Sequence, residues 1–226
     1  MQEFLHYLHM CISRKINTQI IVMNANKFYM MKNDLKLREL IMNADLIASE
    51  YAIFWGAKKI CKPIKAPIRG IALMKELLHY GTQNNFSFFF LGSTDDILER
   101  MISNLYALYP SINIVGYRSG FFSDELDVVS QISKSNTDVL FCALGSPKQE
   151  FFLSKYKDEL GVPLTLGVGG SFDVLAGEYR EAPDWMRNGF EWIFRMVQNP
   201  KVLIKRYALT NTYFLYKIIR YRLFHQ

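Results

Sequence analysis

The chain is poor in cysteine, and its three cysteines, Cys11, Cys61 and Cys142, have no spacing that would suit a metal site. We therefore expect reduced thiols, as in a cytosolic protein. The sequence also lacks any uninterrupted apolar run of the ~20 residues that a membrane-spanning helix needs. Its apolar start, residues 4–8, is short and is interrupted by a histidine, so we predict no secretory signal. These absences predict a protein that is made and kept in the cytoplasm.

Complete nucleotide-binding fingerprints are missing as well. No segment matches a Walker sequence or a full Gly-x-Gly-x-x-Gly motif, which argues against an ATPase and against a nucleotide-dependent oxidoreductase. The four histidines make no set of metal ligands, and no acidic pair is spaced for a metal. Ser146 has no histidine or acid in a context that suggests a hydrolase triad. We expect neither a metal nor a cofactor.

Acidic residues are absent from residues 201–226. The chain has 27 Lys and Arg against 21 Asp and Glu, a net charge of +6. This segment holds six of the basic residues, which are Lys201, Lys205, Arg206, Lys217, Arg220 and Arg222, so residues 1–200 are neutral overall. We predict two parts, an α/β domain over residues 1–200 and a basic tail over residues 201–226 whose partner is an anionic surface.

The tail has the pattern of a basic amphipathic helix. Its cations are interleaved with apolar and aromatic residues at helical spacing, namely Leu203, Tyr207, Phe214, Ile218 and Tyr221. Such a helix suits a membrane interface, where each cation near an anionic leaflet contributes about 1 kcal/mol. Nucleic acid is one alternative partner. Another is the chain's own body or a partner subunit in a homo-oligomer. We favour the membrane and expect no nucleic acid.

Strand-like runs alternate with helix-like segments through the first 200 residues. The predicted strands are residues 19–23, 86–91, 112–115, 139–144 and 162–166, and the predicted helices are residues 35–48, 71–80, 97–108 and 126–133. This alternation predicts a Rossmann-like α/β fold, with a mainly parallel sheet flanked by helices.

Four of these strands run into glycine, at Gly92, Gly116, Gly145 and Gly167. In open α/β sheets, ligands bind outside the carboxyl ends of the strands. Backbone N–H groups exposed in such loops can hold a phosphate. We therefore expect a nucleotide at this edge; the alternative is that each glycine only makes a tight turn.

Several motifs follow one another in the second half of the chain. They are GSPKQE at residues 145–150, GVGGSFD at 167–173, Gly177, Arg180, APDW at 182–185, EWIFR at 191–195, and QNP at 198–200 followed by Arg206 and Tyr207. Together they resemble the WecG/TagA/CpsF glycosyltransferases (glycosyltransferase family 26) over nearly the whole chain. The resemblance implies transfer of a sugar from a UDP-sugar to a polyprenyl-diphosphate-linked sugar at the inner face of the membrane, with inversion and without a metal. It implies a role in surface polysaccharide biosynthesis, with N-acetylmannosamine, its uronic acid or a related hexose as the sugar moved.

The resemblance also implies roles for particular residues. Asn24 lies where the family has a Thr-x-Asn motif, and Glu50 lies where it has the aspartate of an Asp-Gly pair taken to be the catalytic base. Gln149 and Asp173 fall on positions linked to the donor sugar and the nucleotide. Asp173 has an alternative role as a helix N-cap. Asp45, the nearby acidic alternative to Glu50, is expected to have a capping or surface role.

An inverting transfer needs a base for the acceptor hydroxyl and a cradle for the departing diphosphate. The residues predicted to line the nucleotide site are Gly92, Ser93, Gly116, Gly145, Pro147, Gly167, Gly169 and Gly170. Lys148, Arg118 and Arg180 are the candidate cations for the diphosphate. The amide of Gln149 suits sugar hydroxyls because it both donates and accepts hydrogen bonds. Phe172 could pack on the base or belong to the core.

This sequence departs from the family pattern in its first half. Val22 occupies the usual threonine, Glu50-Tyr51 replaces Asp-Gly, and residues 67–72 (PIRGIA) stand where Arg-Val-Thr-Gly-x-Asp is common. We infer that UDP binding is retained and that the choice of sugar or acceptor has changed. The alternative is a catalytically impaired protein that binds a nucleotide sugar.

Overall fold

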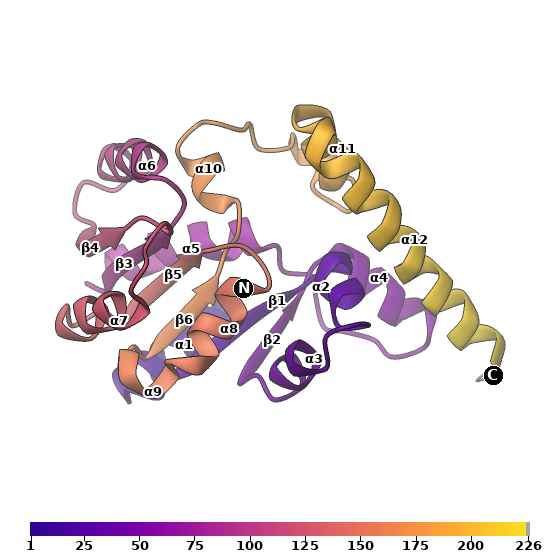
Figure 1. Cartoon of the computed structure of the whole chain (residues 1–226), viewed down its shortest axis with the longest axis horizontal. Helices are drawn as coiled ribbons and strands as arrows, with labels where there is room; N and C mark the ends of the chain where they lie inside the picture. Colours follow the sequence, from indigo (N-terminus) through magenta and orange to yellow (C-terminus); the bar gives the residue numbers. More distant parts are fainter. Residues whose placement is uncertain (225–226) are drawn as a thin grey trace. The chain divides into compact units, whose positions relative to one another are not determined.

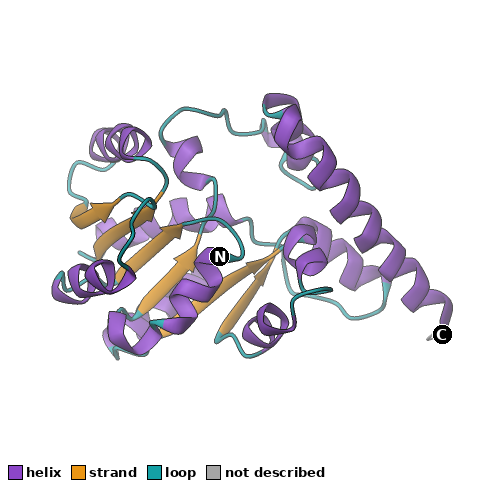
Figure 2. Ribbon diagram, viewed as in Figure 1, coloured by secondary structure: helices purple, strands orange, loops and turns teal. Residues whose placement is uncertain are grey.

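The computed structural model describes residues 1–224, in which six strands form one sheet in the order β2-β1-β6-β5-β3-β4 (Figures 1 and 2). The strands are β1 (Thr18–Met23), β2 (Leu46–Ser49), β3 (Ser87–Gly92), β4 (Asn113–Arg118), β5 (Val139–Ala143) and β6 (Leu164–Gly167). The pairings β1–β6, β6–β5, β5–β3 and β3–β4 are parallel. Helices flank the sheet, so the predicted α/β fold is confirmed. Residues 225–226 of the predicted tail lie outside the described residues.

The helices divide between two compact units. The first unit (Met1–Ile21, Asn43–Leu46 and Gly70–Tyr179) contains α1 (Gln2–Ser13), α5 (Gly70–Gln83), α6 (Asp95–Leu108), α7 (Glu125–Lys134), α8 (Lys148–Lys155), α9 (Lys157–Leu160) and α10 (Ser171–Leu175). The second unit (Val22–Met42, Ile47–Arg69 and Arg180–Gln226) contains α2 (Ala25–Met30), α3 (Leu35–Met42), α4 (Tyr51–Lys59), the 3₁₀ turn η1 (Asp184–Met186), α11 (Glu191–Gln198) and α12 (Pro200–Phe224).

The centre of the first unit is strand β3, whose sequence SFFFLG is buried throughout. A continuous apolar run of this kind is typical of a parallel strand covered on both faces. Successive side chains point to opposite faces. Phe88 and Phe90 stack with Phe141 of β5, with ring centroids 6.0 and 5.6 Å apart. Phe89 and Leu91 belong to the other face, where residues of α7, α8, α9 and β5, together with Tyr156 and Val162, supply the rest of a buried cluster.

The chain between β3 and α6 follows the sequence prediction closely. Thr94 has extended backbone angles, and its side chain accepts a hydrogen bond from the backbone N–H of Ile97, so it is the N-cap of α6. Asp95 and Asp96 occupy the first turn, where their charge suits the positive end of the helix dipole. The helix predicted over residues 97–108 is therefore confirmed, and it begins two residues earlier, at Asp95.

Residues 35–48 do not form the single helix that was predicted. Helix α3 ends at Met42, and Leu46–Ser49 is the edge strand β2. The reason lies in Asp45, whose carboxylate accepts a hydrogen bond of 2.8 Å from the backbone N–H of Gln19 and pairs with Lys157 Nζ at 2.7 Å. These contacts hold the chain in a turn between helix and strand, so Asp45 has the surface role expected for it.

Gly116 was predicted to open a binding loop, and this was wrong. Strand β4 continues to Arg118, so Gly116 lies within the strand. A Cβ at this position would come within 2.5 Å of the buried ring of Phe89, and the strand register shifts beside it. Close packing against a fully buried side chain therefore explains this glycine.

Candidate active site

In the first unit, three glycine-containing loops start at one edge of the sheet, because β3, β5 and β6 are direct neighbours (Figure 1). The register pairs Gly92 with Ala143, and Cys142 with Gly167. We call residues 92–94, 144–148 and 167–171 the glycine edge. The sequence predicted each of these loops separately, and the sheet order brings them together.

The loop after β3 is closely fitted to the strand beside it. Gly92 has φ +130°, and a Cβ there would lie 2.5 Å from the backbone of Ala143. Ser93 has φ +56°, and its carbonyl accepts a 2.9 Å hydrogen bond from Gly120 N–H. The loop that follows β4 is thereby tied to the glycine edge, and it presents the exposed ring of Phe121.

Gln149 links the other two loops from a position in which it is only 1% exposed. Its Nε2 donates to Glu150 Oε1 at 2.9 Å, and its Oε1 accepts from Gly169 N–H at 3.1 Å. A Cβ on Gly167 would lie 2.5 Å from the Gln149 amide nitrogen, so the two residues are in close contact. The amide predicted to meet sugar hydroxyls is thus engaged in holding the 167–170 turn against α8.

Asp173 and Phe172 both lie in the short helix α10, but Asp173 is half-buried whereas Phe172 is fully buried. The N-cap of this helix is Gly170, so the alternative role of Asp173 as an N-cap was wrong. Asp173 is half-buried, and this burial raises the pKa of its carboxyl group. Phe172 is fully buried and meets Phe90 edge-on at 5.8 Å. It belongs to the core, which is one of the two alternatives stated for it from the sequence.

The three predicted cations occupy different surroundings. Lys148 begins α8 at the glycine edge, and its exposed ammonium lies 5.0 Å from the ring centroid of Phe122. Arg118 lies at the end of β4 and binds Asp127 at 2.8 Å on α7. Arg180 belongs to the second unit, where its backbone exchanges two hydrogen bonds with the side chain of Gln198.

In the second unit, Asn24 and Glu50 follow the ends of β1 and β2. The backbone N–H of Glu50 donates to Met23 O at 2.9 Å, which brings the two strand ends together. Asn24 is the N-cap of α2, because its Oδ1 accepts from Lys27 N–H at 3.0 Å. Lys27 is itself buried, and its Nζ donates to Val22 O at 2.9 Å. Glu50 occupies the N-cap position of α4 but its side chain makes no capping bond.

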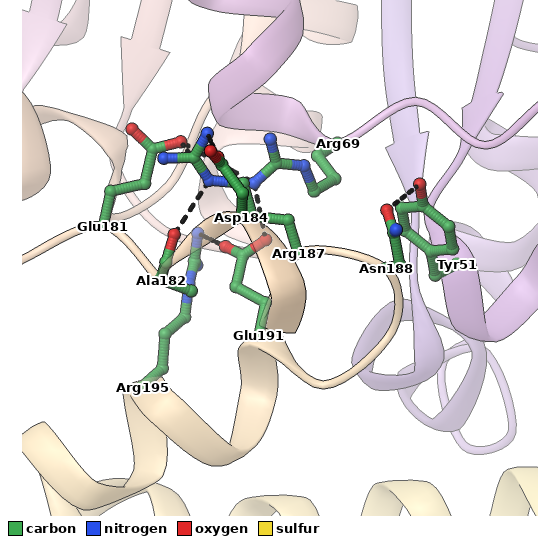
Figure 3. A network of polar contacts seen from close by, with 9 residues as sticks. All are labelled: Tyr51, Arg69, Glu181, Ala182, Asp184, Arg187, Asn188, Glu191 and Arg195. Atoms are coloured by element: carbon green, nitrogen blue, oxygen red, sulfur yellow. Dashed lines mark hydrogen bonds and ion pairs between the residues drawn. The ribbon is translucent and has the colours of Figure 1, made fainter.

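The second unit also contains a cluster of charged side chains that we call the arginine–glutamate network (Figure 3). It consists of Arg69, Glu181, Arg187, Glu191 and Arg195. Glu191 bridges two arginines, with Arg69 Nη1 at 3.1 Å and Arg195 Nη2 at 2.5 Å. Glu181 lies 3.7 Å from Arg69 and 3.6 Å from Arg187. The side chains of the two glutamates are only 18% and 16% exposed, so these ion pairs are shielded from water.

The network is held next to the start of α4. The hydroxyl of Tyr51 donates to Asn188 Oδ1 at 2.8 Å (Figure 3), and Gly189 lies close to Tyr51 and Trp55. Burial disfavours the charged form of Arg195, but the negative charges of Glu191 and Glu50 outweigh this and raise the pKa of Arg195. Glu50 therefore contributes to the electrostatic environment of the network.

This network was not predicted from the sequence. The i, i+4 spacing of Glu191 and Arg195 was a visible signal for an ion pair on one helix. Nothing comparable indicates Arg69, which is 122 positions from Glu191 along the chain.

Residues 201–224 of the tail lie in one helix, α12, and part of the apolar stripe predicted to face a membrane packs on the protein itself, whereas Tyr221 of that stripe is exposed. Phe214 meets Phe28 edge-on at 5.2 Å, and it also contacts Gly56 of α4. Tyr207 meets Trp192 of α11 at 5.7 Å. Other apolar residues of α12 are exposed instead: Val202, Ile204, Leu209, Leu215, Tyr216, Ile219, Leu223 and Phe224. Lys205, Arg206, Arg220 and Arg222 are exposed as well, whereas Lys217 is partly buried.

We call the exposed apolar residues Leu215, Ile219 and Leu223, which share one side of α12 at i, i+4 and i+8, the outer face. Across residues 1–224, no helix combines the length and the apolar character needed to cross a membrane. Within the same residues, no three His, Cys, Asp or Glu side chains gather in a group that could hold a metal ion.

Glycine loops at the carboxyl ends of neighbouring parallel strands are typical of α/β enzymes that bind phosphate-bearing ligands. The model of the "Glycosyl transferase WecG/TagA/CpsF family" matches residues 1–226, so the chain belongs to this family and is a glycosyltransferase.

Two curated relatives are similar over most of the chain. An N-acetylglucosaminyldiphosphoundecaprenol N-acetyl-beta-D-mannosaminyltransferase of Bacillus subtilis is 30% identical over 216 residues, which cover 92% of this chain and 84% of the relative. A protein of the same name from Bacillus spizizenii is 32% identical over 189 residues, covering 81% and 73%.

The link made by Gln149 can be tested by its replacement with leucine, a side chain of similar size. Loss of the acceptor for Gly169 N–H should speed hydrogen exchange at that amide at least about tenfold. The buried polar groups that then lack a hydrogen-bond partner should lower the free energy of unfolding by about 1–3 kcal/mol. NMR-detected hydrogen exchange measures the first effect and urea unfolding the second. The amide of Val168, which bonds to Cys142 O, serves as the internal control. Unchanged exchange at Gly169 would contradict the proposed link.

Proposed function

We propose that this protein transfers N-acetylmannosamine, or a related hexose, from a UDP-sugar to a polyprenyl-diphosphate-linked N-acetylglucosamine. The observation that carries the proposal is the glycine edge, built from three neighbouring strand ends in a chain that matches this family throughout. The names of the two Bacillus relatives support the acceptor and the sugar. The reaction belongs to the synthesis of a surface polysaccharide.

The donor's diphosphate is bound by backbone N–H groups of the glycine edge and by Lys148, whose exposed ammonium begins α8. Gly145 and Gly169 have φ +78° and +51°, conformations that let the backbone turn toward a ligand, and a Cβ at either would meet no neighbouring atom within 4 Å. Open space beside these backbones suits the close approach of a phosphate. Phe121, rather than Phe172, presents an exposed ring on which a base can pack.

The chemical step is an inverting displacement. Glu50 takes the proton from the acceptor hydroxyl as that oxygen bonds to C1 of the donor sugar. The bond from C1 to the diphosphate oxygen breaks on the opposite face, and UDP departs with the electron pair. Fixed donors and cations stabilise the charge that develops on the diphosphate, without a metal. Glu50 is partly exposed and follows the end of β2.

The protein acts at the cytoplasmic face of the membrane, which it meets through the outer face of α12. Leu215 and Leu223 are 59% and 72% exposed, although both are large apolar residues. Exposed cations such as Arg220 and Arg222 accompany them and suit anionic lipid headgroups. Another side of α12 attaches the helix to the rest of the protein, through Phe214 and the buried Thr210.

The transfer itself can be measured with purified protein and radiolabelled donors. We expect a UDP-linked N-acetylhexosamine to label a synthetic acceptor bearing N-acetylglucosamine on a lipid diphosphate, with equal rates in the presence and absence of EDTA. UDP binding without transfer from any donor would favour the alternative of an impaired nucleotide-sugar-binding protein. A rate abolished by EDTA and restored by a divalent metal would contradict the metal-independent step.

Replacement of Glu50 by glutamine should lower kcat by at least about 1,000-fold, because the amide cannot accept the acceptor's proton. The Kd for UDP, measured by calorimetry, should change less than about threefold. Glu39 on α3 offers a control substitution to glutamine, since it is an acidic residue of the same unit. Turnover by Glu50→Gln close to that of the unaltered protein would remove Glu50 as the base.

The membrane role of α12 can be tested without cutting the helix from the body. Replacing Leu215, Ile219 and Leu223 together by serine should reduce binding to phosphatidylglycerol vesicles at least about tenfold, because the buried apolar area is lost. The packed residues stay in place, so the fold should persist. The matched control replaces three exposed leucines elsewhere, Leu35, Leu108 and Leu126, by serine. Equal sedimentation of both variants with vesicles would refute the role.

A further inference from the structure

A buried carboxylate follows the second loop of the glycine edge. Glu150, in the first turn of α8, is only 3% exposed. Helix α8 packs on the buried strands β5 and β6 (Figure 1). A charged side chain is costly to bury unless hydrogen bonds compensate, and an apolar residue of similar size is often as stable in its place. The carboxylate of Glu150 therefore needs an explanation other than the packing of α8 on the sheet.

Two side chains donate hydrogen bonds to the same oxygen of this carboxylate. Ser146 Oγ donates to Glu150 Oε1 at 3.1 Å, and Gln149 Nε2 donates to it at 2.9 Å. Because Ser146 lies in the loop of residues 144–148, the carboxylate fastens this loop to the first turn of α8. The backbone carbonyl of Glu150 also accepts a hydrogen bond from Gln19 Nε2 on β1, at 3.3 Å. Glu150 is thus fixed through both its side chain and its main chain.

The carboxylate also determines which way the Gln149 amide points. An ionised carboxylate only accepts hydrogen bonds, so the amide turns its NH₂ group toward Glu150. The amide oxygen then faces the other way, toward Gly169 N–H, at 3.1 Å. A reversed amide would set two oxygens against each other at Glu150 and two N–H groups against each other at Gly169. Glu150 therefore acts on the Gly169 turn through Gln149.

These hydrogen bonds connect two loops of the glycine edge. Ser146 follows Gly145, and both Gly145 and Gly169 have a positive φ with open space beside the backbone. The hydrogen bonds from Ser146 to Glu150, on to Gln149 and then to Gly169 set the spacing between the two turns. Backbone N–H groups held at a fixed spacing bind an anion without the entropic cost of ordering two loops.

We propose that Glu150 is a positioning residue for the donor's diphosphate, which it serves by joining two loops of the glycine edge through Ser146 and Gln149. This inference rests on the proposed binding of a UDP-sugar at that edge. Glu150 is itself too deeply buried to contact the donor. Its replacement therefore weakens the binding of the diphosphate and spares the binding of the nucleoside.

The test compares UDP with uridine, which lacks the diphosphate. Glu150→Leu should raise the Kd for UDP, measured by calorimetry, at least about tenfold, because the two loops are no longer joined. The Kd for uridine, measured by NMR titration, should change less than about threefold, because no phosphate is involved. Glu150→Gln should keep the Kd for UDP within about threefold of the native value, because its carbonyl oxygen accepts from both Ser146 and Gln149.

Asp138 provides the matched control, since it is a second carboxylate that accepts from a serine. It precedes β5, at the end of the strand away from the glycine edge, and its Oδ2 accepts from Ser87 Oγ at 2.9 Å. Asp138→Leu should lower the melting temperature, yet leave the Kd for UDP within about threefold. Equal weakening of UDP binding by Asp138→Leu and Glu150→Leu would overturn the proposal, because lost stability would then explain the affinity.

Hydrogen exchange at Gly169 N–H reports the connection between the loops without any ligand. Glu150→Leu should speed this exchange at least about threefold, whereas Glu150→Gln should leave it close to the native rate. Faster exchange with an unchanged Kd for UDP would show that the connection does not position the donor, and the proposal would fall. Weakening of UDP and uridine to the same degree would overturn it as well.

Failure of the proposed function gives a different result. If the unaltered protein does not bind UDP, the proposed donor is wrong and the positioning role falls with it. If the unaltered protein binds UDP and Glu150→Leu binds it equally well, only the positioning role falls. Should Glu150→Leu fail to fold, Gln149→Leu replaces it, with the same loss of about tenfold in UDP affinity and the same unchanged Kd for uridine. Unchanged UDP affinity in that variant would also overturn the proposal.

Discussion

The structure depends on the parallel pairing of three buried strands. Strands β3 and β5 have apolar side chains on both faces, β6 contributes the buried Leu164 and Leu166, and the phenylalanines of β3 fill the core on either side. Because the register is fixed by this burial, the carboxyl ends of the strands stop at the same level. The glycine-containing loops that follow these strands therefore start next to one another. The glycine edge is therefore a consequence of how the core is packed.

Much of this arrangement could be predicted from the sequence, because the signals are local. The apolar run of β3, the Thr94 cap and the glycine loops at 92, 145 and 167 are all recognisable over a few residues. The predicted element boundaries were wrong where a residue distant in the sequence determines the local structure. Gly116 remains in a strand because of Phe89, and the chain leaves its helix before Asp45, which bonds to Gln19.

In the candidate site, too, local features could be predicted from the sequence, whereas contacts between distant residues could not. Motif positions such as Gln149 were identified, but the direction of a side chain depends on contacts that a motif does not contain. The Gln149 amide meets Gly169, twenty residues away, and Arg69 meets Glu191 across a much longer separation. Phe172 is a second example, since the motif left a base-packing role and a core role open, and the contact with Phe90 places it in the core. Sequence patterns locate the loops, and tertiary contacts decide which atoms are available to a ligand.

The packing of α12 on α4 has a geometric consequence. Phe214 and Ile218 lie against Gly56, where a Cβ would meet the Phe214 ring at 2.5 Å, so the two helices are in close contact and cannot be separated by larger side chains. An α-helix with its side chains is roughly 10–12 Å wide. Anything that lies along the exposed side of α12 is thus kept about one helix width away from α4. Glycine at position 56 permits this close contact, and a bulkier residue there would push α12 away from α4, the helix that follows Glu50.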